Sequence, residues 1–160
     1  MKKWVMVRHA KSSWEFSLPD RERPLVNRGI KDAILVGQEL NKRNINIDKV
    51  YSSPAKRAFD TAFHMVSKMG LMTEDILIEE NLYDFFGEQA LGFVRSLSDD
   101  LHTIMTFGHN NACIRIAQSL GNYTNANFST ASAVIFHFDV SLWSNINQSD
   151  CTYICPKTLR

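Results

Sequence analysis

Two histidines and two arginines stand just beyond short apolar stretches of this sequence. Arg8 and His9 directly follow the first stretch, Arg57 lies a few residues beyond a second, and His109 follows a later one. An arginine side chain presents a planar, permanently charged set of donors that matches the oxygens of a phosphate group. A guanidinium cannot act as a metal ligand, and its charge repels a cation. The four residues therefore predict a phosphate site, and we expect neither a metal nor another cofactor.

His9 gives this predicted site a group that can react as well as bind. A neutral imidazole nitrogen is a competent nucleophile near pH 7. Its attack on phosphorus would form a phosphoenzyme and divide one difficult displacement into two easier ones. Neighbouring cations would stabilise the charge on the transferred group. These residue types predict phosphoryl transfer to a histidine.

The elements that must position these residues alternate between strands and helices. Short runs rich in β-branched residues predict strands at 5–7, 49–51, 76–78, 103–107 and 134–138. Apolar residues with helical spacing predict helices over 30–37, 59–66, 90–97 and 113–120. This alternation indicates a three-layer α/β/α domain with a mainly parallel central sheet. Such sheets bind ligands beyond the carboxyl ends of their strands, which is where the four residues lie.

Composition limits the class of protein and of partner. The chain has 160 residues and a formal net charge of +1, with acidic and basic residues mixed along its length. We therefore expect one domain spanning residues 1–160 and no nucleic-acid partner. The first apolar run is far shorter than the roughly 20 residues of a membrane helix, so we expect a cytoplasmic protein with no membrane partner. The odd number of cysteines, three, indicates ordinary reduced thiols.

Three blocks of the sequence resemble a known family. The blocks VRHAKSSW, YSSPAKRAFDTA and FGHNN are similar to the three signatures of the histidine phosphatase superfamily, which is also called phosphoglycerate mutase-like. A further stretch, DRERPLVNRGIKDAILVGQEL, is similar to a segment of its small bacterial phosphohistidine phosphatase branch. The three blocks occur in the family's order, each at the end of a predicted strand. The resemblance implies a phosphoglycerate mutase-like fold and a metal-independent phosphatase.

The resemblance also implies a role for each residue of the predicted site. His9 would be the nucleophile that accepts the phosphoryl group. Arg8 and Arg57 would hold the phosphate oxygens, and His109 would donate a further hydrogen bond as an imidazolium. Phosphomonoesterases of this family usually take a general acid from a glutamate after the third strand, and Glu80 is the candidate here, although no convincing motif surrounds it.

The absence of a clear general acid affects which substrate is expected. A serine alkoxide needs a proton in order to leave, whereas imidazole, with a pKa of about 6.5, leaves easily once its nitrogen is protonated. The short connections of the chain also predict a shallow pocket, open to a side chain presented by another protein. These features favour hydrolysis of phosphohistidine on a phosphotransfer or signalling protein, through a phosphohistidine on His9.

Two other functions stay open, together with ordinary interpretations of single residues. One is a phosphomonoesterase acting on a small phosphorylated metabolite or a phosphoserine protein, and the other is a non-catalytic phosphate-binding adaptor. Taken alone, each arginine could be a surface ion-pair partner and each histidine a structural residue. Ser53 is expected to form a turn and a helix cap before Pro54, and Arg23, Trp14 and Tyr83 are expected at the rim of the site.

Overall fold

A computed structural model describes residues 1–160 of the protein. Strands and helices alternate along most of the chain. Their order is β1 (Lys2–Arg8), α1 (Asn27–Lys42), β2 (Lys49–Ser52), α2 (Lys56–Lys68), β3 (Leu77–Ile78), α3 (Glu88–Arg95), β4 (Thr103–Gly108), α4 (Ala112–Leu120), β5 (Ala133–Phe138), β6 (Asp150–Ile154) and α5 (Pro156–Leu159).

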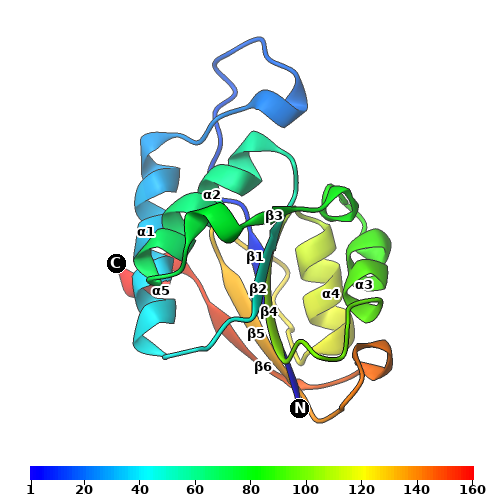
Figure 1. Ribbon diagram of the computed structural model, residues 1–160. Helices are drawn as coiled ribbons and strands as arrows, with labels where there is room; N and C mark the ends of the chain where they lie inside the picture. Colours follow the sequence, from blue (N-terminus) through cyan, green and yellow to red (C-terminus); the bar gives the residue numbers. More distant parts are fainter.

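The strands form one sheet with the order β3-β2-β4-β1-β5-β6 (Figure 1). Strands β1 to β4 are parallel to their neighbours within this group, while β5 runs antiparallel to β1 and β6 antiparallel to β5. The predicted mainly parallel sheet is therefore confirmed. The sequence did not predict β6, because this edge strand is only partly buried and lacks a continuous apolar run.

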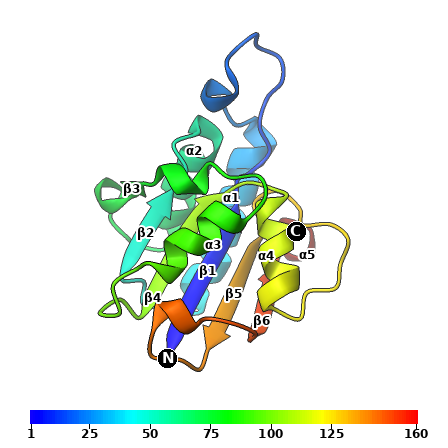
Figure 2. The same ribbon diagram turned by 90° about the vertical axis from the view of Figure 1, so that its right-hand side faces the viewer.

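Helices cover both faces of the sheet (Figure 2). One buried cluster joins α1, α2 and the sheet, with α5 at its margin, and a second joins α3, α4 and the opposite face. Strand β1 lies in the middle of the sheet and is buried along most of its length, as expected for a strand covered on both faces. The predicted three-layer arrangement is confirmed. No helix has both the length and the apolar character that a membrane span requires.

The strand register brings distant parts of the sequence together at one edge of the sheet. Arg8 of β1 pairs with Gly108 of β4, so the residues that follow these two strands are neighbours. The backbone N–H of His9 donates to the Gly108 carbonyl at 3.0 Å. On the other side of β4, the N–H of Ser53 donates to the Phe107 carbonyl at 2.9 Å. The ends of β1, β2 and β4 thus form a shared floor.

The connection from β1 to α1, residues 9–26, projects beyond the body of the molecule in both views (Figures 1 and 2). It contains a short 3-10 helix, Asp20–Glu22, and a β-bridge between Ser12 and Leu25. A close backbone approach joins its start to α1, because a Cβ on Gly29 would lie 2.3 Å from the Lys11 carbonyl oxygen. The contact between Gly29 and Lys11 holds the two ends of the connection close together.

Candidate active site

His9 is the first residue beyond β1, and the structure fixes its ring. Its Nδ1 lies 2.7 Å from the Ala10 carbonyl oxygen, which can only accept, so Nδ1 carries a proton. The other nitrogen, Nε2, then holds a lone pair. Burial lowers the pKa of His9 to about 3, and the positive charge of Arg57 acts in the same direction. At neutral pH this ring is uncharged and is able to act as a nucleophile through Nε2.

Arg57 lies in the first turn of α2 and faces that nucleophilic nitrogen. Its Nε is 3.4 Å from His9 Nε2, and the residue is only 2% exposed. The two terminal nitrogens are bound by Asp20, with Nη1 donating to the backbone carbonyl at 2.7 Å and Nη2 to Oδ2 at 3.0 Å. The structure thus brings the predicted nucleophile and one predicted phosphate-binding arginine into contact.

His109 follows β4 and completes a pair of imidazole rings. The ring centroids of His9 and His109 are 5.3 Å apart, and His109 is 1% exposed. Its Nε2 lies 2.8 Å from Ser53 Oγ, whereas its Nδ1 is buried without a hydrogen-bond partner. Burial lowers the pKa of His109 to about 2, and His9 and Arg57 act in the same direction. The ring is therefore neutral in this structure, in contrast to the imidazolium expected from the sequence.

Arg8 ends β1 beside the same sheet edge. Its Nη1 donates to the Phe128 carbonyl at 2.5 Å, while its Nε is buried and has no hydrogen-bond partner. One end of the guanidinium is thus held by the backbone, and one donor is free. A buried donor without an acceptor is uncommon, and it is satisfied when an anion binds next to it.

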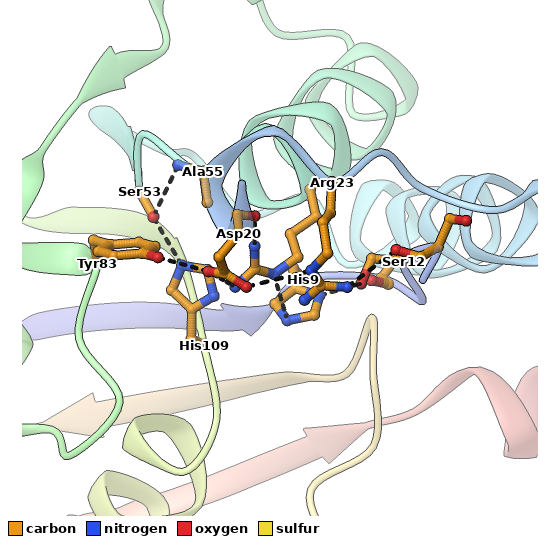
Figure 3. A network of polar contacts seen from close by, with 11 residues as sticks. His9, Ser12, Asp20, Arg23, Ser53, Ala55, Tyr83 and His109 are labelled. Atoms are coloured by element: carbon orange, nitrogen blue, oxygen red, sulfur yellow. Dashed lines mark hydrogen bonds and ion pairs between the residues drawn. The ribbon is translucent and has the colours of Figure 1, made fainter. Parts of the chain in front are cut away.

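Asp20 is a residue of this site that the sequence reasoning missed. Besides its bonds to Arg57, its carboxylate accepts from the Tyr83 hydroxyl at 2.6 Å and from Arg23 Nε at 3.3 Å (Figure 3). Burial raises its pKa, but the hydrogen bonds from Tyr83 and Arg57 outweigh this effect and bring the pKa to about 2. Asp20 is 37 residues from Arg57 and 63 from Tyr83 in the sequence, so no local pattern indicated the cluster.

The three residues expected at the rim differ in burial: Arg23 is buried, Tyr83 is partly buried and Trp14 is exposed. Arg23 is 6% exposed, and its Nη1 donates to Ser12 Oγ at 2.7 Å. The central carbon of its guanidinium lies 3.5 Å from the centroid of the Trp14 ring. Trp14 itself stays 78% exposed. Tyr83 packs edge-on against His109, with ring centroids 5.3 Å apart. Arg23 is therefore part of the polar network rather than a peripheral charge.

The structure does not support Glu80 as a general acid. Its carboxylate forms a two-pronged ion pair with Arg21, at 2.9 and 3.1 Å, and its side chain is 67% exposed. The hydrogen bond from Arg21 lowers the pKa of Glu80, which favours the ionised form. Glu80 makes no hydrogen bond to either histidine or to Arg57. A paired, ionised carboxylate has the wrong protonation state to donate a proton.

Taken together, the site combines a neutral nucleophile with fixed cations. His9 Nε2 faces Arg57, and two buried nitrogens, Arg8 Nε and His109 Nδ1, have no hydrogen-bond partner. This set suits an oxyanion whose central atom is attacked by an imidazole. No group of three or more His, Cys, Asp or Glu side chains has the arrangement of a metal site.

Comparisons with known proteins give relatives by sequence and by fold. An uncharacterized protein of Mycobacterium leprae is 30% identical over 124 residues, which cover 74% of each chain. Phosphoserine phosphatase 1 of Hydrogenobacter thermophilus is 37% identical over 86 residues, covering 49% of this chain and 39% of that protein. The solved structure of the protein histidine phosphatase SixA complexed with tungstate superposes with a TM-score of 0.82 at 18% identity, covering 99% of each chain.

Most of the chain also matches the model of a protein family. The family model of the histidine phosphatase superfamily, branch 1, matches residues 4–102. The match includes Arg8, His9 and Arg57, and it ends shortly before His109. It spans more than half of the chain and agrees with the fold. The chain belongs to the histidine phosphatase superfamily.

Proposed function

We propose that the protein is a phosphatase that removes phosphate from phosphohistidine on a phosphotransfer or signalling protein, through a phosphohistidine formed on His9. The observation that carries this proposal is the position of His9 Nε2, 3.4 Å from Arg57 Nε. The hydrogen bond from Nδ1 to the Ala10 carbonyl leaves Nε2 as the nitrogen with a lone pair. A nucleophile beside a permanent cation is suited to attack an anionic phosphoryl group.

The reaction has two displacements at phosphorus. In the first, His9 Nε2 forms a bond to phosphorus, and the bond between phosphorus and the substrate imidazole breaks. The substrate ring is protonated on its other nitrogen before this step and leaves as neutral imidazole. In the second, water attacks phosphorus and the bond to Nε2 breaks, so inorganic phosphate leaves with the oxygen and both hydrogens of the water, and His9 is regenerated with its proton on Nδ1. Arg57 and Arg8 are assigned to the phosphate oxygens, where they would stabilise charge in both steps.

The character of the leaving group supports phosphohistidine as the substrate. Glu80, the acid candidate, is ion-paired with Arg21 and exposed, and Asp20 is held ionised by Tyr83 and Arg57. Neither carboxyl is in the form that donates a proton. An imidazole can be protonated from solvent near neutral pH and leaves as a neutral ring, whereas an alkoxide leaving group depends on a positioned acid. The similarity in fold to the protein histidine phosphatase SixA supports the same substrate class.

Single-turnover labelling tests this proposal. The enzyme is mixed with a radiolabelled phosphohistidine peptide, quenched within one turnover and analysed for bound label. We expect acid-labile, alkali-stable phosphate on the wild-type protein and none on His9→Ala. The matched control is His102→Ala, which alters an exposed histidine outside the site and should keep the label. Label that persists in His9→Ala would reject His9 as the acceptor.

A phosphomonoesterase is the second candidate, favoured by the similarity to phosphoserine phosphatase 1 over 86 residues. The two candidates differ in their dependence on a proton donor. Comparing kcat/KM on a phosphohistidine peptide and on an alkyl phosphate separates them. The second candidate gains if the alkyl phosphate is the better substrate and if Glu80→Gln slows it sharply. Phosphate release from either substrate excludes a non-catalytic adaptor.

A further inference from the structure

Ser53 and His109 form a buried polar pair at the edge of the site, and the reaction described above gives Ser53 no role. A contact of 2.8 Å joins Ser53 Oγ and His109 Nε2 (Figure 3). The two residues are 0% and 1% exposed. They are 56 positions apart in the sequence and meet because β2 and β4 are neighbours in the sheet. The pair is almost completely buried, so each polar group of these two side chains that lacks a hydrogen-bond partner costs free energy.

The hydrogen bonds of Ser53 decide which nitrogen of His109 carries the proton. Ser53 Oγ accepts a hydrogen bond from the Ala55 backbone N–H at 3.2 Å. Its hydroxyl has one hydrogen to donate, and His109 Nε2 is the only acceptor bonded to it. If Nε2 carried a proton and donated it instead, two buried groups would lack a partner, the hydroxyl hydrogen of Ser53 and the lone pair of His109 Nδ1. The Nδ1–H form leaves only one group without a partner, Nδ1–H itself, and is the form with the smaller cost. Ser53 therefore donates to Nε2, and the neutral ring carries its proton on Nδ1.

The Nδ1–H group of His109 is then a donor that lacks an acceptor. It is buried without a hydrogen-bond partner, in a ring whose centroid is 5.3 Å from that of His9. The positive charge of Arg57 acts on the same ring. An oxygen of an anion bound between His9 and His109 would accept from this group. The opposite tautomer would present a lone pair to that oxygen and repel it.

We propose that Ser53 is a positioning residue that holds His109 as the Nδ1–H tautomer, so that the neutral ring donates to an oxygen of the transferred phosphoryl group. The identification of that oxygen rests on the proposed function, whereas the tautomer does not. In this arrangement His109 supplies a hydrogen bond without adding a third positive charge beside Arg8 and Arg57. The hydrogen bond from the Ser53 hydroxyl keeps a proton on Nδ1, so the ring can donate without becoming an imidazolium.

The tautomer can be read directly by NMR, with no substrate and no turnover. Long-range 1H–15N correlation of uniformly labelled protein distinguishes a protonated from an unprotonated ring nitrogen, and His109→Asn identifies the signals of His109 by their loss. We expect wild-type His109 to have a proton on Nδ1 and none on Nε2. In Ser53→Ala the signals should shift toward the Nε2–H tautomer. A wild-type ring protonated on Nε2 would overturn the proposal.

Matched variants separate this role from a general effect of altering the buried turn. Ser52→Ala removes an equally buried neighbouring hydroxyl, which donates to the Ser53 carbonyl at 2.9 Å, and should leave the tautomer of His109 unchanged. Ser53→Thr keeps a hydroxyl on the same atom position and should restore the Nδ1–H form. Should the added methyl perturb the turn, Ser53→Cys keeps a weaker donor and should give an intermediate result.

Binding of inorganic phosphate supplies the functional half of the test. We expect Ser53→Ala to raise the Kd for phosphate about 10-fold, the effect of one lost hydrogen bond to a charged group. Ser52→Ala should match the wild type, and Ser53→Thr should recover most of the affinity. Unchanged affinity in Ser53→Ala, despite an altered tautomer, would overturn the role of Nδ1–H. Absence of a phosphoenzyme on the wild type would instead reject the proposed function and leave the tautomer result standing.

Discussion

Asp20 is the residue whose position is hardest to reconcile with a site for an anion. Its Oδ2 accepts from Arg57 Nη2 at 3.0 Å and from the Tyr83 hydroxyl at 2.6 Å. These donors hold the carboxylate ionised, with a pKa of about 2 against the opposing effect of burial. An ionised carboxylate on the Arg57 guanidinium uses donors that a phosphate oxygen would need. Asp20 and a bound phosphate must therefore compete for Arg57 or share it with mutual repulsion.

This competition predicts the effect of removing the charge. Asp20→Asn keeps the size of the side chain and abolishes the repulsion, so we expect inorganic phosphate to bind about 2- to 5-fold more tightly near neutral pH, a range suited to a partly exposed charge. Isothermal titration calorimetry measures the Kd for inorganic phosphate of the variant and of the wild type. Asp139→Asn, outside this network, is the control with the same change of net charge. Weaker binding in Asp20→Asn would mean that Asp20 serves mainly to orient Arg57.

At the scale of elements, the site depends on how tightly α1 packs against the chain that leaves β1. Gly29 in α1 allows this approach, because a Cβ there would lie 2.3 Å from the Lys11 carbonyl oxygen. That carbonyl also accepts a hydrogen bond from the Val26 N–H at 3.0 Å. Lys11 is two residues beyond His9, so the contact between α1 and this segment also helps to fix the position of the nucleophile.

Two glycines in helices give this argument a matched test. Alanine normally stabilises a helix relative to glycine by roughly 1 kcal/mol. Gly92→Ala in α3, where nothing lies within 4 Å of the added Cβ, should show that gain. Gly29→Ala should instead lower the free energy of unfolding by about 1–3 kcal/mol, because the backbone must shift to relieve the contact. Denaturant unfolding measures both, and equal effects of the two variants would contradict the packing argument.

At the scale of the whole molecule, two buried neutral histidines couple stability to pH. The pKa values of His9 and His109 are lowered to about 3 and about 2, chiefly by burial, from about 6.5 in an unfolded chain. Between these limits the unfolded chain binds more protons than the folded one. Above about pH 6.5 both rings are neutral in the folded and the unfolded chain, and their protonation does not affect the free energy of unfolding. As the pH falls below about 6.5, protonation of the unfolded chain lowers that free energy progressively.

The expected loss is large enough to measure. Well below about pH 6.5 each histidine should cost about 1.4 kcal/mol per pH unit, so at about pH 5.5 the pair should lower the free energy of unfolding by about 2.5 kcal/mol relative to neutral pH. His109→Asn removes one titrating ring and should reduce this difference by about half, while His102→Asn, at an exposed position, should keep it. Denaturation curves at the two pH values measure this change in the free energy of unfolding. A change in His109→Asn as large as in the wild type would show that His109 is not a buried neutral ring whose pKa is lowered by folding.

The sequence by itself determined the sheet, most of its strands and helices, and the set Arg8, His9, Arg57 and His109. These features leave local traces, because hydrophobic periodicity marks buried faces and polar residues just past a strand mark its end. Parallel strands in one sheet then bring such ends together. The same local signals also indicated Ser53 as a residue of the turn before α2.

Only the tertiary structure decided which groups touch within that set. Asp20 reaches Arg57 because the projecting connection from β1 to α1 folds back onto the site, and no periodicity encodes that path. Ser53 meets His109 through the pairing of β2 with β4, and the protonation of both histidines follows from burial. Contacts between distant segments and the exclusion of water arise only when the layers pack. For that reason a sequence can identify the reacting residues without revealing their charge, their tautomer or their competitors.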